Sequence, residues 1–589
     1  MKKLINKKII LLGILLIIGT LTISAVNASE NVTQEVANID GSEEIVNVED
    51  SADEVIIAEN EYDDVMTTDS QTFSQLNTAI NGNVASDIYL TGNYAFKLGI
   101  DDNFKDGIPI SRNVTIHGNG FTLDGADAAS MFSVNDESDV NISVVYMDII
   151  FINGNNRYGG AISICDAAIN CTFINNKADF GGAIHYGSAV NCTFINNTSH
   201  DYGGAIYSGC AVNCTFINNT AYSKGGAIYG DNENNDGDAI NCTFINNKAK
   251  SGGAIFTGRH GIAVYCTFIN NKATEKGGAM YDGEVTYCNF TNNSAENGGA
   301  TYRCDAYACE FTNNMAEENG GAIYGDEIYY KDNISYCVFI GNSARNGGAV
   351  YMAIGNYCDF INNSATEKGG AIYNGTGYYC YFIENKAKTG GDDSYASTLV
   401  KFSSKLTAPA KVNAIYNNGN YLVIGLKDQY GNDFIGYDIS VNIDGKTTIV
   451  YTEENGQAKM STNGLAPGTH NVKITFDGDV NYDKSTAISK IVVKKATPKL
   501  TAAKKTFKKS VKIKKYVITL KTNKNKIMKN VVVKLKINGK TYKAKTNSKG
   551  KATFKITKLT KKGKHEATVK FAGNKYYNSK TVKTQIRVK

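Results

Sequence analysis

Apolar positions recur with a period of about 22 residues from Gly159 to Gly391. Each period holds two short segments in which a constant apolar residue alternates with a variable one, as in CTFINN (171–176) and GGAIY (203–207). Because successive side chains of a strand point to opposite faces, the constant Cys, Phe and Ile positions predict an inward face. A period this short favours one coil of three short strands, and stacked coils predict a parallel β-helix with one continuous core.

The predicted core contains one column of cysteines and one of phenylalanines. We interpret the cysteines as buried thiols, because no C-x2-C spacing of the kind used by zinc sites is present. A few disulfides are the alternative, and they would involve Cys165, Cys210 or Cys304, which lie outside the repeat register. The predicted columns are Cys171, Cys192, Cys214, Cys242, Cys266, Cys288, Cys309, Cys337, Cys358 and Cys380, and Phe173, Phe194, Phe216, Phe244, Phe268, Phe290, Phe311, Phe339, Phe360 and Phe382.

The outward positions of the repeat carry aromatic residues, which are the candidate ligand-binding surface. Aromatic side chains supply contact area to glycans or proteins at low entropic cost, although stacked tyrosines can equally serve to stabilise the strands. The main predicted stripe is Tyr207, Tyr229, Phe256, Tyr281, Tyr302, Tyr324, Tyr351 and Tyr373. A second stripe, directly before register cysteines, is Tyr265, Tyr287, Tyr336, Tyr357 and Tyr379.

Asparagine and glycine mark the predicted corners. An Asn lies three residues after each register Phe, as at Asn176, and these positions predict a stacked Asn ladder at a turn. The Gly pairs predict positive φ at a second corner. Asn170 and its equivalents form N-x-T glycosylation motifs, but we place them inside strands and therefore expect modification in loops or near Asn31 instead.

Beyond Gly391 the period ends, and two similar units follow. The segment IDGK (443–446) of the first matches INGK (537–540) of the second, and both show alternating strands with regular turn signals. This pattern predicts two immunoglobulin-like β-sandwiches, over 396–495 and 496–589.

The N-terminus combines basic residues, an apolar run and a small-residue cleavage site, which predict a signal peptide over 1–28. An uncleaved membrane anchor is the alternative. Residues 29–70 are acidic and poor in aromatics, so we expect a disordered spacer there and the β-helix over 71–395. The segment from Ala496 on contains roughly thirty Lys and Arg but a single acid, Glu566. This excess of positive charge favours contact with an anionic cell-wall polymer or lipid head groups.

Catalytic chemistry has little support in the sequence. His117, His185, His200 and His260, like the few arginines, occupy unrelated coil positions, whereas polysaccharide-active β-helix enzymes gather acids and bases on one face. The acids Asp231, Glu233, Asp236 and Asp238, with Asn235, crowd one insertion where calcium is conceivable, but a solvated loop is the simpler interpretation. We predict no catalytic residue, metal ligand or cofactor, and no nucleic-acid partner.

The GGAI and FxxN motifs resemble the repeats of chlamydial polymorphic outer-membrane proteins and, more closely, adhesin-like surface proteins of methanogenic archaea. The segment NVTIHGNGFTLDGAD (113–127) is similar to early coils of pectin-lyase-like right-handed β-helices, and the end of the chain resembles bacterial immunoglobulin-like domains. The resemblance implies an extracellular, cell-surface adhesin that contacts glycans or surface proteins of another cell. A polysaccharide lyase or glycoside hydrolase, and a structural coat component, are the alternatives.

Overall fold

The computed structural model describes residues 70–134, 142–231, 237–258, 261–326 and 332–589. The predicted signal peptide and all but the last residue of the predicted spacer therefore lie outside the described residues. The chain forms two compact units. One comprises the described residues up to Thr376 together with Ile383–Thr398, and the other comprises Gly377–Phe382 with Leu399–Lys589.

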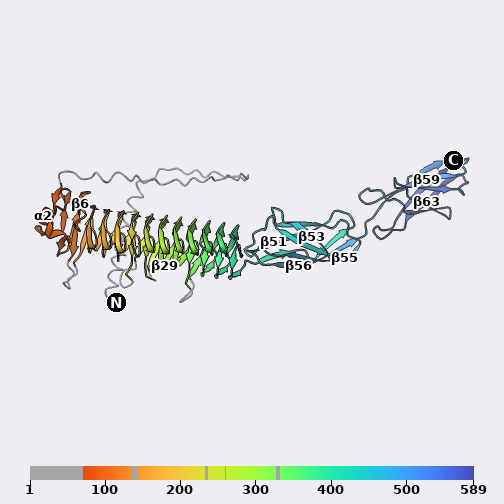
Figure 1. The fold of residues 1–589 in the computed structure, drawn as a ribbon. Coiled ribbons are helices and arrows are strands. Elements are labelled where there is room, and N and C mark those ends of the chain that lie inside the picture. Colours follow the sequence, from red (N-terminus) through yellow and green to blue (C-terminus); the bar gives the residue numbers. More distant parts are fainter. Residues whose placement is uncertain (1–69, 135–141, 232–236, 259–260, 327–331) are drawn as a thin grey trace. The chain divides into compact units, whose positions relative to one another are not determined.

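The first unit is a parallel β-helix, visible in Figure 1 as a regular stack of short strands. One of its sheets has fourteen strands, and each strand pairs in parallel with the equivalent strand of the next coil, so that Phe173 lies beside Phe194 and Phe194 beside Phe216. The predicted all-β fold of a parallel β-helix followed by two sandwiches is thereby confirmed. The strands of this sheet are β1 (Gln71–Thr72), β3 (Tyr94–Ala95), β6 (Thr122–Asp124), β9 (Ile150–Ile152), β12 (Thr172–Ile174), β15 (Thr193–Ile195), β19 (Thr215–Ile217), β23 (Thr243–Ile245), β27 (Thr267–Ile269), β30 (Asn289–Thr291), β33 (Glu310–Thr312), β37 (Val338–Ile340), β41 (Asp359–Ile361) and β45 (Tyr381–Ile383).

A second parallel sheet of eleven strands follows the Asn corner. Its outward positions are polar, as in the Lys-Ala-Lys-Ser strand, whose burial alternates between exposed and buried. The strands are β10 (Asn155–Tyr158), β13 (Lys177–Phe180), β16 (Thr198–Tyr202), β20 (Thr220–Ala221), β24 (Lys248–Ser251), β28 (Lys272–Lys276), β31 (Ser294–Asn297), β34 (Met315–Asn319), β38 (Ser343–Asn346), β42 (Ser364–Lys368) and β46 (Lys386–Ala387).

The third side of the coil consists of two rows of strands, so a typical coil has four short strands and the predicted three is wrong. A residue with positive φ bends the chain between the rows, for example Ser208 (58°) and Met352 (60°). The row after the Gly pair contains β17 (Ile206–Tyr207), β21 (Ile228–Tyr229), β25 (Ile255–Phe256), β35 (Ile323–Tyr324), β39 (Val350–Tyr351), β43 (Ile372–Tyr373) and β47 (Ser394–Tyr395). The next row contains β2 (Asp87–Tyr89), β5 (Val114–His117), β8 (Val144–Met147), β11 (Ala167–Ile169), β14 (Ser188–Val190), β18 (Ala211–Val212), β22 (Ala239–Ile240), β26 (Ile262–Val264), β36 (Asn333–Ser335), β40 (Ile354–Asn356), β44 (Thr376–Tyr378) and β48 (Thr398–Val400), while β29 (Met280–Thr286) and β32 (Thr301–Tyr307) run through both rows.

The cysteine and phenylalanine columns are buried in the described coils, and the exposed fraction of each of these residues is 4% or less. Neighbouring Phe rings stack with centroids 4.7 to 4.9 Å apart, close to the spacing of hydrogen-bonded strands. The backbone N–H of one Cys donates to the Sγ of the next coil's Cys, at 3.4 Å between Cys171 and Cys192. All thirteen cysteines are free thiols, so the possible disulfides are not formed in this structure.

The buried Asn residues form the predicted ladder. Asn197 Nδ2 donates to the Oδ1 of Asn219 at 3.0 Å and to the carbonyl of Phe173 at 3.0 Å, and its Oδ1 accepts from the backbone N–H and Nδ2 of Asn176. Each amide in the run thus satisfies its hydrogen bonds inside the core, as burial requires. The positive φ belongs to the preceding residue, for example Asn196 at 55°, and not to the ladder Asn.

The Gly pair has two different roles. The first glycine carries the predicted positive φ, for example 66° at Gly203. The second has no room for a side chain, because a Cβ on Gly204 would lie 2.0 Å from the carbonyl oxygen of Gly226. Coils therefore approach each other closely only because both residues are glycine.

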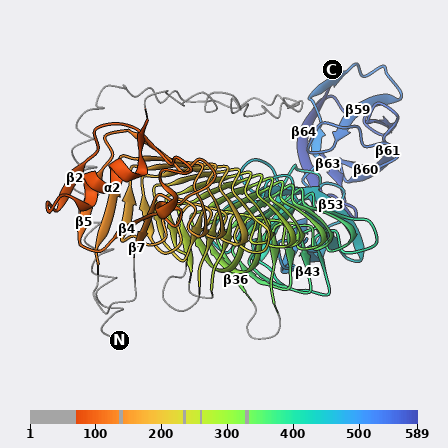
Figure 2. The same ribbon diagram turned by 60° about the vertical axis from the view of Figure 1, so that its left-hand side comes forward.

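A helix that the sequence analysis missed lies at the start of the described β-helix. Helix α2 (Phe73–Asn81) begins with a capping box between Thr72 and Gln75 and buries Phe73, Leu76 and Ile80 on one face. The helix packs against β1, β3 and β4 (Ile108–Ile110), at the end of the β-helix where Figure 2 also labels β2, β5 and β7 (Phe132–Val134). A short 3-10 turn, η1 (Asp102–Phe104), follows nearby in sequence. The helix covers apolar core that the first coils would otherwise expose to water.

The second unit contains two β-sandwiches of the same design. Each pairs a three-stranded sheet with a five-stranded sheet around its own apolar core. The first consists of β49 (Ser404–Thr407), β51 (Tyr421–Asp428) and β54 (Gln457–Ser461), with β50 (Lys411–Ile415), β56 (Ser485–Lys494), β55 (Gly468–Phe476), β52 (Asp438–Ile443) and β53 (Lys446–Tyr451). The second consists of β57 (Lys499–Thr501), β59 (Lys514–Lys521) and β62 (Lys551–Ile556), with β58 (Lys505–Phe507), β64 (Lys580–Val588), β63 (Gly563–Phe571), β60 (Val532–Ile537) and β61 (Lys540–Lys545).

Candidate functional site

The main predicted stripe, from Tyr207 to Tyr373, is a continuous stack of rings that we call the tyrosine row. Neighbouring centroids lie 4.5 to 5.5 Å apart. The expectation that this row is exposed is wrong for Phe256 and Tyr302, which are only 8% exposed, and the other members are half-buried. Lysine side chains at the end of the eleven-stranded sheet's strands cover the rings. Nζ of Lys224, which follows β20, lies 4.5 Å from the Phe256 centroid, and Nζ of Lys276, at the end of β28, lies 4.8 Å from that of Tyr302.

The more exposed aromatic surface lies at the corner before the register cysteines. We call Tyr265, Tyr287, Tyr307, Tyr336 and Tyr357 the tyrosine corner; their exposed fractions are 41 to 60%. The rings touch in sequence, with centroid distances of 5.2, 5.9, 5.6 and 5.5 Å. Tyr307 is not part of the predicted stripe. In its coil Ala308 occupies the corner position, and the Tyr307 ring contacts Tyr287 of the coil before and Tyr336 of the coil after.

The backbone of the tyrosine corner is in an unfavourable conformation for its residue type. Tyr265, Tyr287, Tyr336 and Tyr357 have φ between 52° and 57°. This left-handed region costs an ordinary L-residue about 1–2 kcal/mol, whereas Gly, Asn and Asp adopt it readily. A tyrosine is therefore a poor choice for the fold at these positions.

The same corner carries Asn or Asp in the preceding coils. Ile240 pairs with Val264, so Asn241 and Tyr265, which follow them, occupy one position in consecutive coils. Asn241 Nδ2 donates to Asn213 Oδ1 at 2.8 Å, and Asn191 donates to Asn170 at 3.2 Å. The prediction that Asn170 and its equivalents lie inside strands is wrong, because positive φ places them at an outward corner.

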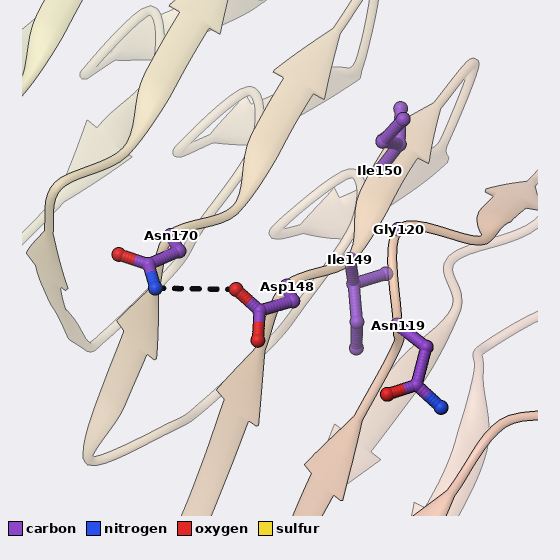
Figure 3. Close-up of a pocket in the computed structure, with 6 residues that line it drawn as sticks. All are labelled: Asn119, Gly120, Asp148, Ile149, Ile150 and Asn170. Atoms are coloured by element: carbon purple, nitrogen blue, oxygen red, sulfur yellow. Dashed lines mark hydrogen bonds between the residues drawn. The ribbon is translucent and has the colours of Figure 1, made fainter.

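A shallow hollow of about 440 Å³ lies at the beginning of this corner (Figure 3). Asn170 Nδ2 donates to Asp148 Oδ1 at 3.1 Å on one side of it. Asn119, Gly120, Ile149 and Ile150 complete the lining. Within the described residues its only ionisable group is the exposed Asp148 carboxylate, so the hollow offers no acid–base pair.

The candidate chemistry of the insertions is only partly within the described residues. Glu233, Asn235 and Asp236 lie outside them. Asp231 accepts a hydrogen bond from Ser208, and Asp238 accepts from the N–H of Ile262. In the described ranges no group of three or more His, Cys, Asp or Glu is arranged to hold a metal ion.

The histidines and arginines are dispersed, as far as the structure describes them. His117 pairs with Asp87 and His200 with Asp201, while His185 stacks on Tyr207. Arg303 lies between Asp282 and Asp326, with N–O distances of 3.9 and 3.5 Å. These three histidines and Arg303 lie on different coils and do not form one cluster.

Among the described helices, none is long and apolar enough to span a membrane.

The repeats match a known family model. Eight segments match the Chlamydia polymorphic membrane protein repeat, and together they make up less than half of the 589 residues. The chain thus carries repeats of this type on a parallel β-solenoid. The likeness to archaeal surface proteins stays a prediction. The matched segments are 170–186, 191–209, 213–231, 241–258, 265–279, 308–326, 336–353 and 357–375.

Bacterial adhesins are among the solved structures with some similarity. A Ca²⁺-stabilized adhesin with which an Antarctic bacterium binds ice is 13% identical over 33% of this chain and 51% of that chain, with a TM-score of 0.16. Invasin, a bacterial integrin-binding protein, is 16% identical over 31% of this chain and 40% of its own, with a TM-score of 0.22. The Yersinia pseudotuberculosis adhesin InvE is 14% identical over 31% of this chain and 58% of its own, with a TM-score of 0.17. The search of curated proteins found no match.

Proposed function

We propose that this chain is a secreted, surface-exposed adhesin-like protein without enzymatic activity, in which the β-helix presents a binding face. The observation that carries the proposal is the tyrosine corner, a line of exposed, touching aromatic rings on the outward side of five successive coils. Its partner would be a glycan or a surface protein of another cell. The polymorphic membrane protein repeats support a cell-surface role.

Both the strain and the exposure of the tyrosine corner favour binding over folding. Asn in the preceding coils makes side-chain hydrogen bonds at the same corner at little conformational cost. Tyr gains about 0.5–1.5 kcal/mol from ring stacking, which only offsets the backbone cost. An amphipathic ring with an exposed edge and a hydroxyl group is suited to contact with sugar rings and peptide surfaces.

The tyrosine row has a different part in this proposal. Its rings are largely enclosed by neighbouring rings and by lysines such as Lys224 and Lys276, so they mainly stabilise parallel strands. The half-buried ring edges of the tyrosine row would add little area to such a contact. Residues 1–28 would direct export, and residues 496–589 would make the envelope contact that their charge predicts.

The test is binding of the full-length exported protein to a glycan array and to intact cells. Replacing Tyr265, Tyr287, Tyr336 and Tyr357 with Asn, the residue of the preceding coils, is expected to lower binding at least tenfold while the β-helix stays folded by circular dichroism. The matched control replaces three exposed tyrosines of the first sandwich, Tyr421, Tyr430 and Tyr451, with Asn. Binding that survives in the first variant, or is lost equally in both, would contradict the proposal.

A further inference from the structure

The two sandwiches have the same strand register but differ in the charge of equivalent surface positions. In the first, Ser440 of β52 lies directly opposite Ile449 of β53 and Thr475 of β55. The second places Lys534 of β60 opposite Lys543 of β61 and Lys570 of β63. The IDGK and INGK segments align Ser440 with Lys534 and Ile449 with Lys543, and the match of Gly468 with Gly563 aligns Thr475 with Lys570. One uncharged row of the first sandwich is therefore a row of three lysines in the second, which we call the lysine row.

The lysine row lacks charge compensation. All three lysines are exposed, and no ion pair forms anywhere in residues 496–589, which the structure describes in full. Glu566, the one acid, accepts a hydrogen bond from Gln585 instead. Like charges directly opposite each other in an antiparallel pair destabilise a sheet. The row therefore costs stability in the isolated protein.

The surroundings of the lysine row are basic and polar. Lys536, one row further along β60, lies between Thr541 and Thr568, and Thr568 pairs with Lys583 of β64. Lys534 and Lys570 also line a shallow hollow of about 460 Å³, together with Val532 and Asn574. Strands lie about 4.8 Å apart, so the row places three ammonium groups along roughly 10 Å across the sheet.

The opposite, three-stranded sheet is also basic but is arranged differently. Lys515 of β59 lies opposite Lys555 of β62, and the exposed Val517 follows two residues along the strand. That sheet has two separate pairs of opposed lysines, Lys515 with Lys555 and Lys499 with Lys521, whereas the five-stranded sheet has three lysines in line. It provides a charge-matched control on the same domain.

We propose that the outer face of β61, β60, β63 and β64 (labelled in Figure 2) binds a linear polyanionic polymer of the envelope through the lysine row. A line of charges with interleaved threonines and an adjoining hollow fits a chain with repeated carboxylate or phosphate groups. A lipid surface is the poorer fit, because membrane-surface contacts generally bury several large apolar side chains beside the basic ones, whereas the lysine row and the row beside it carry only lysine and threonine, with the single exposed Val532 next to them. This inference deepens the proposed envelope contact and does not involve the tyrosine corner.

The test uses the full exported chain with polygalacturonate, polyphosphate and phosphatidylglycerol vesicles as probes. The variant Lys534→Ser, Lys543→Thr and Lys570→Thr takes the first sandwich's Ser440 and Thr475 at two positions and a polar Thr in place of its apolar Ile449 at the third. We expect it to bind the polymers at least tenfold more weakly at low salt. The slope of log K against the logarithm of the salt concentration is expected to become shallower by roughly two to three. The control Lys515→Ser, Lys551→Ser and Lys555→Ser removes the same charge from the other sheet and is expected to change binding less than threefold.

Three results would overturn the proposal: equal weakening in both variants, wild-type binding to vesicles but to neither polymer, or no binding to any probe at low salt. Thermal unfolding provides a second measurement without ligand. Removing opposed like charges is expected to raise the Tm of the second sandwich in the lysine-row variant. The four-tyrosine variant, assayed in parallel, should bind the polymers as the wild type does, so failure of the tyrosine-corner proposal and of this one can be told apart.

Discussion

Thr301 lies beside Ile323 in the parallel ladder between β32 and β35, fully buried and with a hydroxyl that no described group hydrogen-bonds. Equivalent coils have Ile, Met or Val at this position. A buried hydroxyl without a partner costs about 1–3 kcal/mol. We therefore expect Thr301→Val, which keeps the shape, to raise the free energy of unfolding by about 1 kcal/mol in a urea titration. A destabilised variant would show that the hydroxyl has a partner.

The phenylalanine column predicts a steep difference between neighbouring residues. Phe216 is fully buried and stacks on Phe194 at 4.7 Å, whereas Thr215 points to the outer face of the same strand. Phe216→Ala is expected to destabilise the β-helix by about 3–5 kcal/mol, because it leaves a cavity in a continuous stack. Thr215→Ala should cost under about 1 kcal/mol. Equal costs in urea unfolding would mean that the two faces are assigned the wrong way round.

The cysteines predict a thiol-labelling pattern. Burial raises the pKa of the Cys192 and Cys214 thiols well above the usual range, so little reactive thiolate is present. Cys210 is the one cysteine that is not fully buried. Mass spectrometry after brief native treatment with a thiol reagent should find label on Cys210 first and little on the ladder, and unfolding should release the remainder. Rapid native labelling of Cys192 and Cys214 would contradict the inward ladder.

His185 predicts a pH effect on stability. Burial lowers its pKa to about 4, with the carboxylate of Asp231 opposing part of the shift. The unfolded chain titrates near pH 6.5, so between about pH 6.5 and 4 only the unfolded state binds the proton and stability falls as the pH falls. Above pH 6.5 the ring is neutral in both states and contributes no slope.

The matched variant for this effect is His185→Tyr, which adopts the residue found at Tyr207 and Tyr229 in the following coils. Urea titrations at pH 7 and pH 4.5 should show a smaller loss of stability for the variant than for the wild type. Identical losses would assign the acid sensitivity to other groups.

The repeat could be predicted from the sequence because its register is strict. Within each coil Cys, Phe and Asn keep a fixed spacing, and each stacks on residues of its own kind in the coils before and after, as Phe194 does on Phe173 and Phe216. Helix α2 lies before the repeats and is not itself repeated, so its capping box at Thr72 and Gln75 was overlooked. The fourth strand of the coil was missed because residues such as Ser208 and Met352, which bend the chain, give no glycine signal.

Exposure was harder to predict than alternation. A period of two separates inward from outward residues, but it does not reveal that Lys224 extends over Phe256 from a different sheet. The lysine row likewise could not be predicted from the sequence. Lys534 and Lys570 are far apart in the chain, and only the pairing of β60 with β63 places them opposite each other. The excess of charge was evident from the sequence, whereas its line across the sheet was not.

The direction of the backbone hydrogen bonds has a mechanical consequence. In the β-helix they join one coil to the next, as between the N–H of Asn196 and the carbonyl of Ile217, and the Asn197 to Asn219 bond runs the same way. A pull along the stacking axis is therefore shared by all the bonds of a coil boundary at once, and separating two coils requires breaking them together. Such a scaffold resists stretching better than it resists peeling of a single strand from its end.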